Sequence, residues 1–543
     1  MWTQNYTPLA GSLGLSALAA AVPAILMIYL LGVRRMAAWK ASVIGLGVAV
    51  VVALVVYQMP VGLVAGSFFC GAAYGLFPIG WIIFGAILLY HVAVESGKFE
   101  IIKDSLATVT DDRRVQALLI AFLLEAFLEG CAGFGAPVAV AATMLIGLGF
   151  SPFYAASICL LVNTVPVTFG SVGTPIMTSA AVTGLPINSI ARAAALVIFP
   201  LSLFVPTYLI FVMGGWKGLK GVLPAALTTS VVWATMQFLI AWNVGPHLAS
   251  IGSALITMVV LMALLRFWQP KDHWVPPGDH MVHTTHKRHS AGEVIWAWSP
   301  YIILVVMVLL WGLFKPLLNK VSVVFPWPGL DGMVTEIAPV VKGPTPYRAM
   351  FTFDWLGAAG SAAALSAVIS AVLLGLSPAR FFKAFRGACK QVKLAEVTIA
   401  AVLALAFVMN YSGQTATLGL IFATTGALFP FFSPVLGGVG GFVTGSSTSA
   451  AALFGNLQVV TATRLGLNPI LMAGANQGGA VMTKIISLQN IAVAASSVGL
   501  MPSDEGGLFR WTLRHSILLV AMVGVVTMFL TYVVPQWVPV LGH

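Results

Sequence analysis

The stretch of sequence that decides the fold reads Asn163-Thr-Val-Pro-Val-Thr-Phe-Gly-Ser-Val-Gly-Thr-Pro175. It lies inside an apolar segment, residues 153–183, that is long enough to cross a lipid bilayer. Proline and glycine at this density end a helix, and a bilayer tolerates an interrupted helix only within protein or beside a water-filled cavity. The stretch therefore predicts a broken helix at the depth of the membrane.

The composition of the whole chain also points to a membrane. Of the 543 residues, 59% are hydrophobic and only 8% are charged, and the mean hydropathy is +0.98. Soluble domains have about a quarter of charged residues, so this composition argues against a water-soluble enzyme or a nucleic-acid-binding protein. The four cysteines lie far apart in the sequence, which indicates neither a disulfide framework nor a zinc cluster.

Apolar stretches near the length of a membrane span follow one another along the chain. We expect spans at 11–31, 41–58, 76–94, 153–183, 192–213, 222–243, 249–267, 294–314, 354–376, 394–411 and 516–537, with less regular stretches around 115–150, 433–460 and 468–500. The connections alternate between loops rich in lysine and arginine and loops that have none. The net charge of +11 therefore indicates basic cytoplasmic loops, an external N-terminus and a long external loop at 315–353.

Two segments of the chain resemble each other. Residues 96–108 align with residues 412–424, and clusters of small residues follow both in the same order. Residues 95–114 carry four Lys or Arg, whereas residues 411–430 carry none, so the two copies should have opposite orientations in the membrane. Inverted repeats are typical of secondary transporters, whose substrate binds between the repeats near the midplane. The alternative is chance similarity between segments rich in glycine, alanine and leucine.

Each predicted repeat is interrupted twice. The stretch Gly130–Pro137 is matched by Gly445–Ser449, and both predict the tip of a re-entrant hairpin. The stretch 163–175 is matched by 476–487, and both predict a broken helix. Broken helices expose N–H groups with partial positive charge, and Asn, Ser and Thr add hydrogen bonds, so together they can cradle a small carboxylate. The alternative is that these small residues only allow close helix packing. The expected substrate-binding residues are Gly133, Gly135, Asn163, Thr164, Thr168, Ser171, Ser446, Ser447, Thr448, Asn476, Gln477 and Lys484.

Ionisable residues within a span are costly and therefore mark functional sites. Glu125 and Glu129 lie one helical turn apart in an apolar stretch, where two carboxylates favour a shared proton. Together with Asp354 they are the candidates for proton coupling. The structural alternatives are a polar face of the hairpin for the two glutamates and a helix N-cap for Asp354. Lys484 is the one basic residue within a predicted break, and we expect it to pair with a substrate carboxylate.

The loop 268–293 has four histidines at a spacing of three, His280, His283, His286 and His289. A metal-sensing tract is one interpretation, but solvated histidines on a polar loop are the more common case. We expect no metal site. The sequence contains no GxxxxGK[ST] phosphate loop, so we expect transport to be driven by an ion rather than by ATP, and we expect no cofactor.

Several runs resemble the bacterial L-lactate permease family. They are Phe127-Leu-Glu-Gly-Cys-Ala-Gly-Phe-Gly-Ala-Pro137, Asn163-Thr-Val-Pro-Val-Thr-Phe-Gly170, Phe353-Asp-Trp355, Asn410-Tyr-Ser-Gly413 and Trp2-Thr-Gln-Asn-Tyr6. The resemblance extends over nearly the whole chain and implies proton symport of small 2-hydroxymonocarboxylates, namely L-lactate and often D-lactate and glycolate. It also implies kinship with ion transporters that pair inverted hairpin and broken-helix repeats and often work as elevators.

The second hairpin tip departs from the family pattern. Members commonly have Gly-Ser-Asp-Thr-Ser there, whereas this chain has Ser447 in the place of the aspartate. By position, Glu129, Asn163, Asp354 and Lys484 match the family. If the aspartate carries the coupled proton in relatives, Glu129 or Glu125 must carry it in this chain.

These observations predict an all-α polytopic membrane protein of roughly 12–14 transmembrane helices in a single transporter domain. We expect import of L-lactate, D-lactate and glycolate by proton symport across the cytoplasmic (inner) membrane. The expected partners are this substrate and membrane lipid, with no nucleic acid, and a homodimer is compatible with the sequence. The alternatives are a passive anion channel, a symporter for another small carboxylate, and a membrane-embedded enzyme that uses Glu129 and His91. The enzyme alternative is not supported by any catalytic motif in the sequence. The expected parts are a first repeat at about 76–213, a second repeat at about 394–537, scaffold helices at 11–58, 222–314 and 354–376, and the external loop at 315–353.

Overall fold

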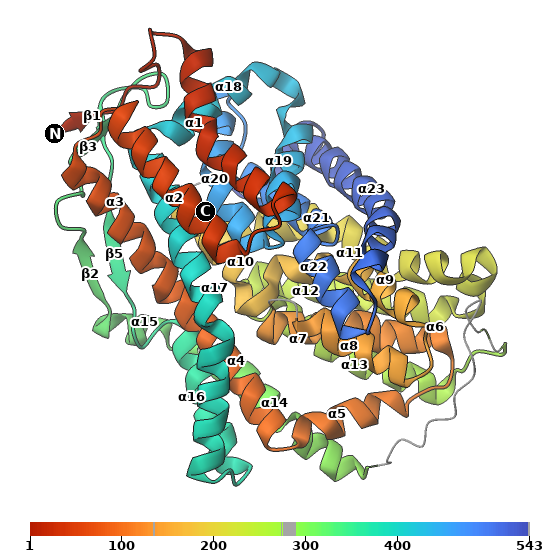
Figure 1. The fold of residues 1–543 in the computed structure, drawn as a ribbon. Helices are drawn as coiled ribbons and strands as arrows, with labels where there is room; N and C mark the ends of the chain where they lie inside the picture. Colours follow the sequence, from red (N-terminus) through yellow and green to blue (C-terminus); the bar gives the residue numbers. More distant parts are fainter. Residues whose placement is uncertain (134–135, 273, 275–288, 541–543) are drawn as a thin grey trace.

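The computed structural model describes residues 1–133, 136–272, 274 and 289–540 (Figure 1). Within these residues, 12 helices are long and apolar enough to cross a membrane, and one bent pair of helices qualifies as a further span. The strands in the described part are two to four residues long. The prediction of an all-α polytopic membrane protein is thus confirmed.

The N-terminal part contains one helix that the apolar stretches did not predict. Helix α3 is rich in glycine, and these glycines allow it to pack directly on the backbone of a later helix, α17. A Cβ on Gly71 would lie 2.6 Å from the carbonyl oxygen of Leu403. Phe77, with extended backbone angles, separates α3 from α4. The elements of this part are β1 (Trp2–Thr3), α1 (Leu13–Ile28), η1 (Tyr29–Val33), α2 (Ala38–Val55), α3 (Val61–Tyr74), η2 (Gly75–Gly80) and α4 (Trp81–Glu95).

The next part consists of a short surface helix, a helical hairpin, an interrupted helix and a long helix. Every residue of the first hairpin arm, from Arg113 to Ala132, is buried. The apolar segment 153–183, which the sequence predicted as one span, divides into two helices separated by a short 3₁₀ turn. The elements are α5 (Lys98–Ala107), α6 (Arg113–Gln116), η3 (Ala117–Leu124), α7 (Glu125–Ala132), α8 (Ala136–Gly147), α9 (Pro152–Val162), η4 (Val165–Phe169), α10 (Gly170–Thr183) and α11 (Ile187–Gly221).

The middle of the chain supplies three long helices and the strand-bearing segment. Strand β2 pairs with β5 in an antiparallel hairpin, and β1 from the N-terminus pairs with β3. The sequence predicted only a loop at 315–353, because strands this short carry no clear alternation of polar and apolar residues. The elements are α12 (Leu223–Asn243), α13 (Ala249–Phe267), α14 (Ala291–Leu313), α15 (Lys315–Leu318), η5 (Asn319–Val321), β2 (Val323–Pro326), β3 (Val334–Glu336), β4 (Thr345–Pro346), β5 (Met350–Phe353) and α16 (Ala359–Leu373).

The C-terminal part again forms a short helix, a helical hairpin, an interrupted helix and a long helix. Glycines with positive φ end the helix before each short helix, Gly97 at +76° and Gly413 at +87°. The elements are α17 (Pro378–Ser412), α18 (Gln414–Phe422), η6 (Ala423–Leu428), α19 (Phe429–Thr444), α20 (Ser447–Arg464), α21 (Pro469–Lys484), α22 (Leu488–Ser497), η7 (Pro502–Asp504), α23 (Glu505–Tyr532) and η8 (Pro535–Trp537).

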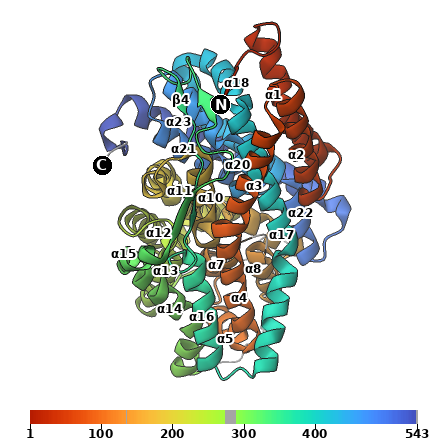
Figure 2. The same cartoon turned by 90° about the vertical axis from the view of Figure 1, so that its left-hand side faces the viewer.

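The two parts with this shared element order pack against each other at the centre of the molecule. Helix α10 packs on α20, and α11 packs on α21. Helices α1 to α4, α16 and α17 form a layer beside them, which Figure 2 shows from its outer side. The two interruptions therefore lie next to each other in the interior.

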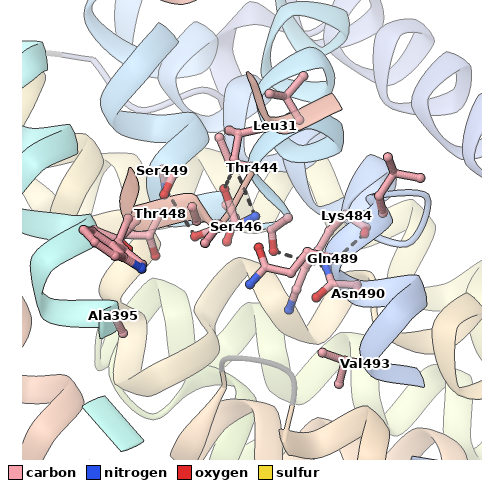
Figure 3. A pocket seen from close by; sticks show the side chains of 18 of the residues that line it. Leu31, Ala395, Thr444, Ser446, Thr448, Ser449, Lys484, Gln489, Asn490 and Val493 are labelled. Carbon is pink, nitrogen blue, oxygen red and sulfur yellow. Dashed lines mark hydrogen bonds between the residues drawn. The ribbon is translucent and has the colours of Figure 1, made fainter. Parts of the chain in front are cut away.

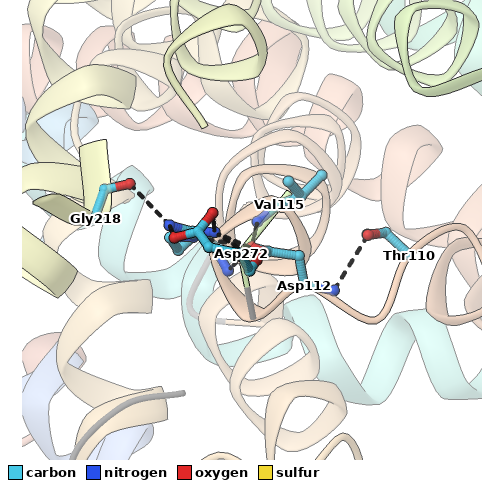
Figure 4. A network of polar contacts seen from close by, with 6 residues as sticks. Thr110, Asp112, Val115, Gly218 and Asp272 are labelled. Carbon is cyan, nitrogen blue, oxygen red and sulfur yellow. Dashed lines mark hydrogen bonds and ion pairs between the residues drawn. The ribbon is translucent and has the colours of Figure 1, made fainter. Parts of the chain in front are cut away.

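A buried arginine ties the base of the first hairpin to its neighbours (Figure 4). The Arg114 side chain has no exposed surface and forms ion pairs with Asp112 at 2.6 Å and with Asp272 at 2.9 Å. Its guanidinium also donates to the carbonyl oxygen of Gly218 at 3.2 Å. A buried arginine is stable only when its donors are satisfied in this way, so the network fixes the hairpin to the end of α11 and to the segment after α13.

Candidate functional site

The first interruption has a backbone that an ordinary helix cannot adopt. Helix α9 ends at Val162, and three consecutive residues, Ser171, Val172 and Gly173, have φ angles of +44°, +55° and +83°. Two of these residues carry a Cβ, so the left-handed conformation stores strain there. Such strain persists only where the surrounding structure holds the backbone in place.

Side chains from α12, α13, α21 and the connection between α12 and α13 hold this backbone by donating the hydrogen bonds that helical N–H groups would otherwise supply. Four carbonyl oxygens of the interruption each receive a side-chain hydrogen bond, which satisfies buried backbone groups that the break leaves open. The pairs are Gln237 Nε2 to Val165 O at 3.2 Å, Ser250 Oγ to Pro166 O at 2.6 Å, His247 Nδ1 to Val172 O at 2.8 Å, and Gln477 Nε2 to Pro175 O at 3.1 Å.

The second interruption is shorter and follows Lys484. Helices α21 and α22 meet at an angle of 43° across residues 485–487. Ser487 Oγ caps α22 by accepting from the Asn490 N–H at 3.2 Å. The Asn490 side chain donates to the carbonyl oxygens of Lys484 at 3.0 Å and Gly445 at 3.2 Å, so it ties the break to the second hairpin tip.

This arrangement differs from the predicted second break, which began at Asn476. Helix α21 is continuous through Asn476 and Gln477. Asn476 Oδ1 accepts from Gln458 Nε2 at 2.9 Å, and Gln477 donates to the first interruption, so both side chains join helices. The glycines that suggested a break allow close packing instead, because a Cβ on Gly479 would overlap the carbonyl group of Pro434.

A cluster of charged and amide side chains joins the two halves of the molecule. Lys484 Nζ lies 3.0 Å from Glu129 Oε1, and both side chains are buried. Asn163 Nδ2 donates to Glu129 Oε2 at 3.0 Å and also to Glu125 Oε1. Gly170 leaves room for the carboxylate, since a Cβ there would lie 3.0 Å from Glu129 Oε1. The predicted charges are thus brought together, with Lys484 paired to a carboxylate of the protein itself.

A cavity of about 570 Å³ lies beside this cluster (Figure 3). Its wall includes Glu129 and Lys484, residues 444–449 of the second tip, and the first residues of α10 and α22. Leu31, Gly32 and residues 35–39 also line the cavity, together with Glu505 and the polar residues Gln391 and Thr398 of α17. Ser447 and Thr448 are the first residues of α20, whose N–H groups have no partner within the helix, so this wall favours an anion.

Six of the fifteen predicted site residues line the cavity. Those in its wall are Glu129, Ser171, Ser446, Ser447, Thr448 and Lys484. Gly133, Asn163, Thr164, Thr168 and Glu125 lie behind the wall, in the first tip and the first break. Gly135 lies outside the described residues. The first tip packs on the first break, because a Cβ on Gly133 would overlap Ser171 Oγ.

Asp354 lies apart from this cluster. Its Oδ1 accepts from the Gly357 N–H at 3.0 Å and from Ser322 Oγ at 2.6 Å, at the turn that leads into α16. The residue is absent from the cavity wall. The N-cap position of α16 is Ala358, so Asp354 closes the turn before the helix and is not its N-cap.

Several wall residues were not predicted. Gly170 and Thr174 belong to the stretch 163–175, and Ser449 belongs to the second tip motif, so both motifs could have indicated these wall residues. Gln489 and Asn490 follow the second break and could have been found by placing the break at residues 485–487, directly after Lys484. Residues 31–39 gave no local signal, because only the fold brings that loop to the cavity.

The described residues contain no group of three or more His, Cys, Asp or Glu arranged to hold a metal ion. Of the four spaced histidines, His280, His283 and His286 lie outside the described residues. His289 Nε2 lies 3.1 Å from Asp104 Oδ2, so it links the loop to helix α5.

The chain is similar to known proteins over nearly its whole length. The L-lactate permease family profile matches residues 16–534. An L-lactate permease of Bacillus subtilis strain 168 is 42% identical, with 99% of each chain covered. A glycolate permease of Escherichia coli K12 is 41% identical, with 98% of each chain covered. An L-lactate permease of Salmonella typhimurium is 40% identical, over 99% of this chain and all of the relative.

Proposed function

The chain belongs to the L-lactate permease family, as the sequence motifs predicted, and we propose that it transports L-lactate and glycolate across the cytoplasmic membrane by proton symport. Relatives carrying the names of lactate and glycolate permeases cover nearly the full length of the chain, which supports this substrate class. The family consists of permeases, so the alternative of a membrane-embedded enzyme is rejected.

The observation that carries the proposal is the buried ion pair of Lys484 and Glu129 in the cavity wall. A charge in the membrane interior needs a partner of opposite sign, and here one ammonium faces one carboxylate across 3.0 Å. A substrate carboxylate that enters the cavity competes for the same ammonium.

Proton coupling follows from this competition. When the substrate carboxylate pairs with Lys484, Glu129 loses its counter-ion and takes up a proton, so the site stays neutral. When the substrate leaves, Glu129 releases the proton and returns to Lys484. The empty and the loaded site then have the same charge, whereas a site with substrate and no proton carries an uncompensated buried anion. The serine and threonine hydroxyl groups of the wall offer hydrogen bonds to the 2-hydroxyl group of the substrate.

The orientation in the membrane is supported by ion pairs between segments that the sequence places on the same side. Arg35 pairs with Glu505, and Lys383 pairs with Glu95, so loops predicted to be cytoplasmic meet one another. The Trp2 N–H bonds to Met333, which joins the N-terminus to the loop predicted to be external. Because residues of the loop 31–39 line the cavity, we propose that the cavity opens to the cytoplasm and that the N-terminus is external.

The inverted repeat is part of the same proposal. In both halves a positive-φ glycine, Gly133 or Gly445, forms the hairpin tip, and the tip packs on the interruption of its own half. The shared element order supports a relation by inversion, as does the presence of four Lys or Arg in residues 95–114 and of none in residues 411–430.

Reconstitution in liposomes tests the function. The purified protein should accumulate labelled lactate and glycolate inside vesicles when the exterior is made acidic, and it should discriminate against succinate. A sodium gradient alone should give no accumulation. Uptake that only equilibrates substrate and ignores the imposed pH difference would establish the passive channel instead.

A further inference from the structure

Two glutamates face the same asparagine in the candidate site, but their surroundings differ. Glu129 lies in the cavity wall and pairs with Lys484. Glu125, one turn earlier in α7, is fully buried and absent from the wall. Its Oε1 accepts from Asn163 Nδ2, and its Oε2 has no hydrogen-bond partner in the described part of the chain.

The charges around Glu125 allow only one ionised carboxylate. The titratable groups that face it from the neighbouring elements are Glu129 on α7, the Cys159 thiol on α9 and Lys484 on α21. Lys484 supplies the one positive charge, and Glu129 lies within hydrogen-bonding distance of it. An ionised carboxylate needs several donors to replace water, whereas Glu125 has one donor that it shares with Glu129. A second unpaired anion at this depth is too costly to persist.

We propose that Glu125 holds a proton that stays with the protein, and that Asn163 positions Glu129 as the single carboxylate whose proton crosses with the substrate. This rests on the proposed proton symport. In the empty site, Glu125 is a neutral acid and Glu129 is the anion paired with Lys484. Loading adds one proton to Glu129 and one substrate anion to Lys484, and unloading removes both. One proton then moves with each monocarboxylate, and Glu125 takes no part in the exchange.

The break after helix α9 explains why the side chain of Asn163 reaches the two glutamates of α7. Asn163 is the residue at which helix α9 ends, with φ −72° and ψ 57°, so its side chain leaves the helix toward α7. Its amide nitrogen has two hydrogens and can serve both carboxyl groups at once. Donation to Glu129 favours the ionised carboxylate that faces Lys484, so loss of this donor should make Glu129 easier to protonate.

The first test compares two isosteric substitutions in liposomes. Glu125→Gln mimics the neutral acid and should keep uphill uptake and the wild-type number of protons per lactate, with a rate within about threefold of wild type. Glu129→Gln should exchange labelled for unlabelled lactate but lose accumulation and substrate-driven proton uptake. If Glu125→Gln exchanges lactate without accumulating it, or halves the proton count, Glu125 carries a transported proton and the inference fails.

The second test follows the pH profile of uptake. Asn163→Leu removes both donors and should move the alkaline limit of uptake upward by about 1 to 2 pH units, the effect of losing one hydrogen bond to a charged group. Asn163→Ser keeps a hydroxyl donor and should move the limit less, and it serves if the leucine variant does not fold. An unchanged profile in the folded variants would refute the positioning role. Absence of any proton movement in the wild type would instead refute the proposed function.

Discussion

Lys484→Met removes the ammonium that both Glu129 and the substrate need, and it preserves most of the side-chain volume. The variant leaves Glu129 buried without a counter-ion, which should destabilise the protein by about 3–5 kcal/mol. Substrate binding should weaken by the value of a hydrogen bond between charged groups, about 1.5–3 kcal/mol, or about 10- to 150-fold in Kd. The double variant Lys484→Met with Glu129→Gln should regain part of the stability, because no unpaired anion remains.

The assay for this prediction combines thermal unfolding in detergent with equilibrium binding of labelled lactate. Lys383→Met is the matched control, because Lys383 pairs with Glu95 at 3.0 Å but has 72% of its side chain exposed. The control should lose no more than about 1 kcal/mol and keep its Kd, as expected for a surface ion pair. If Lys484→Met keeps a Kd within about twofold of wild type, the reasoning about the ammonium is refuted.

Three further predictions concern the structure around the site. Gly445→Ala should lower the Tm and slow uptake, because Gly445 has φ +65° and a Cβ would lie 2.9 Å from Ser487 Oγ. The control Gly466→Ala, at φ +68° with open space around it, should lower the Tm only through backbone strain. An equal loss of Tm in the two variants would contradict a close contact at the tip. Arg114→Lys should lower the Tm strongly, by the equivalent of about 3 kcal/mol, whereas Arg348→Lys in an exposed ion pair should change the Tm little. Similar Tm values for the two variants would show that the buried network does not contribute to stability. Burial lowers the pKa of His247 from 6.5 to about 4. Between pH 6.5 and 4 the unfolded chain therefore binds more protons than the folded chain, and the stability falls as the pH falls. This pH dependence should be smaller in His247→Gln, and Tm curves of the two proteins that run parallel from about pH 7 to 4 would contradict this prediction.

Much of the fold could be predicted from the sequence, because lipid imposes a simple rule on segment length. The apolar stretch 249–267 coincides with helix α13, and 222–243 nearly coincides with α12. Helix α17 starts at Pro378, before the expected span at 394–411, because its basic first turns extend beyond the apolar part. Helix α3 was missed because its glycines, which lower the apparent helix signal, serve to bring it against α17.

The candidate site was predicted less completely, because sequence motifs show that a helix changes direction but not where. The second tip and the first break lie where the small residues and the prolines indicated, whereas residues 134 and 135 of the first tip lie outside the described residues. In α21 the same residue types occur without a break, since Gly479 faces the backbone at Pro434. Lys484 and Glu129 were each singled out as costly charges at depth, but their pairing needed the three-dimensional structure. The residues of loop 31–39 reach the cavity only through tertiary packing.

The central claim is that a single buried ammonium serves the protein carboxylate and the substrate carboxylate in turn. The most direct measurement follows protons and labelled lactate together in vesicles that contain a trapped pH indicator. The account predicts that wild type takes up one proton with each lactate, and that Glu129→Gln still exchanges lactate with no proton signal. A Glu129→Gln protein that moves protons with lactate as wild type does would contradict it.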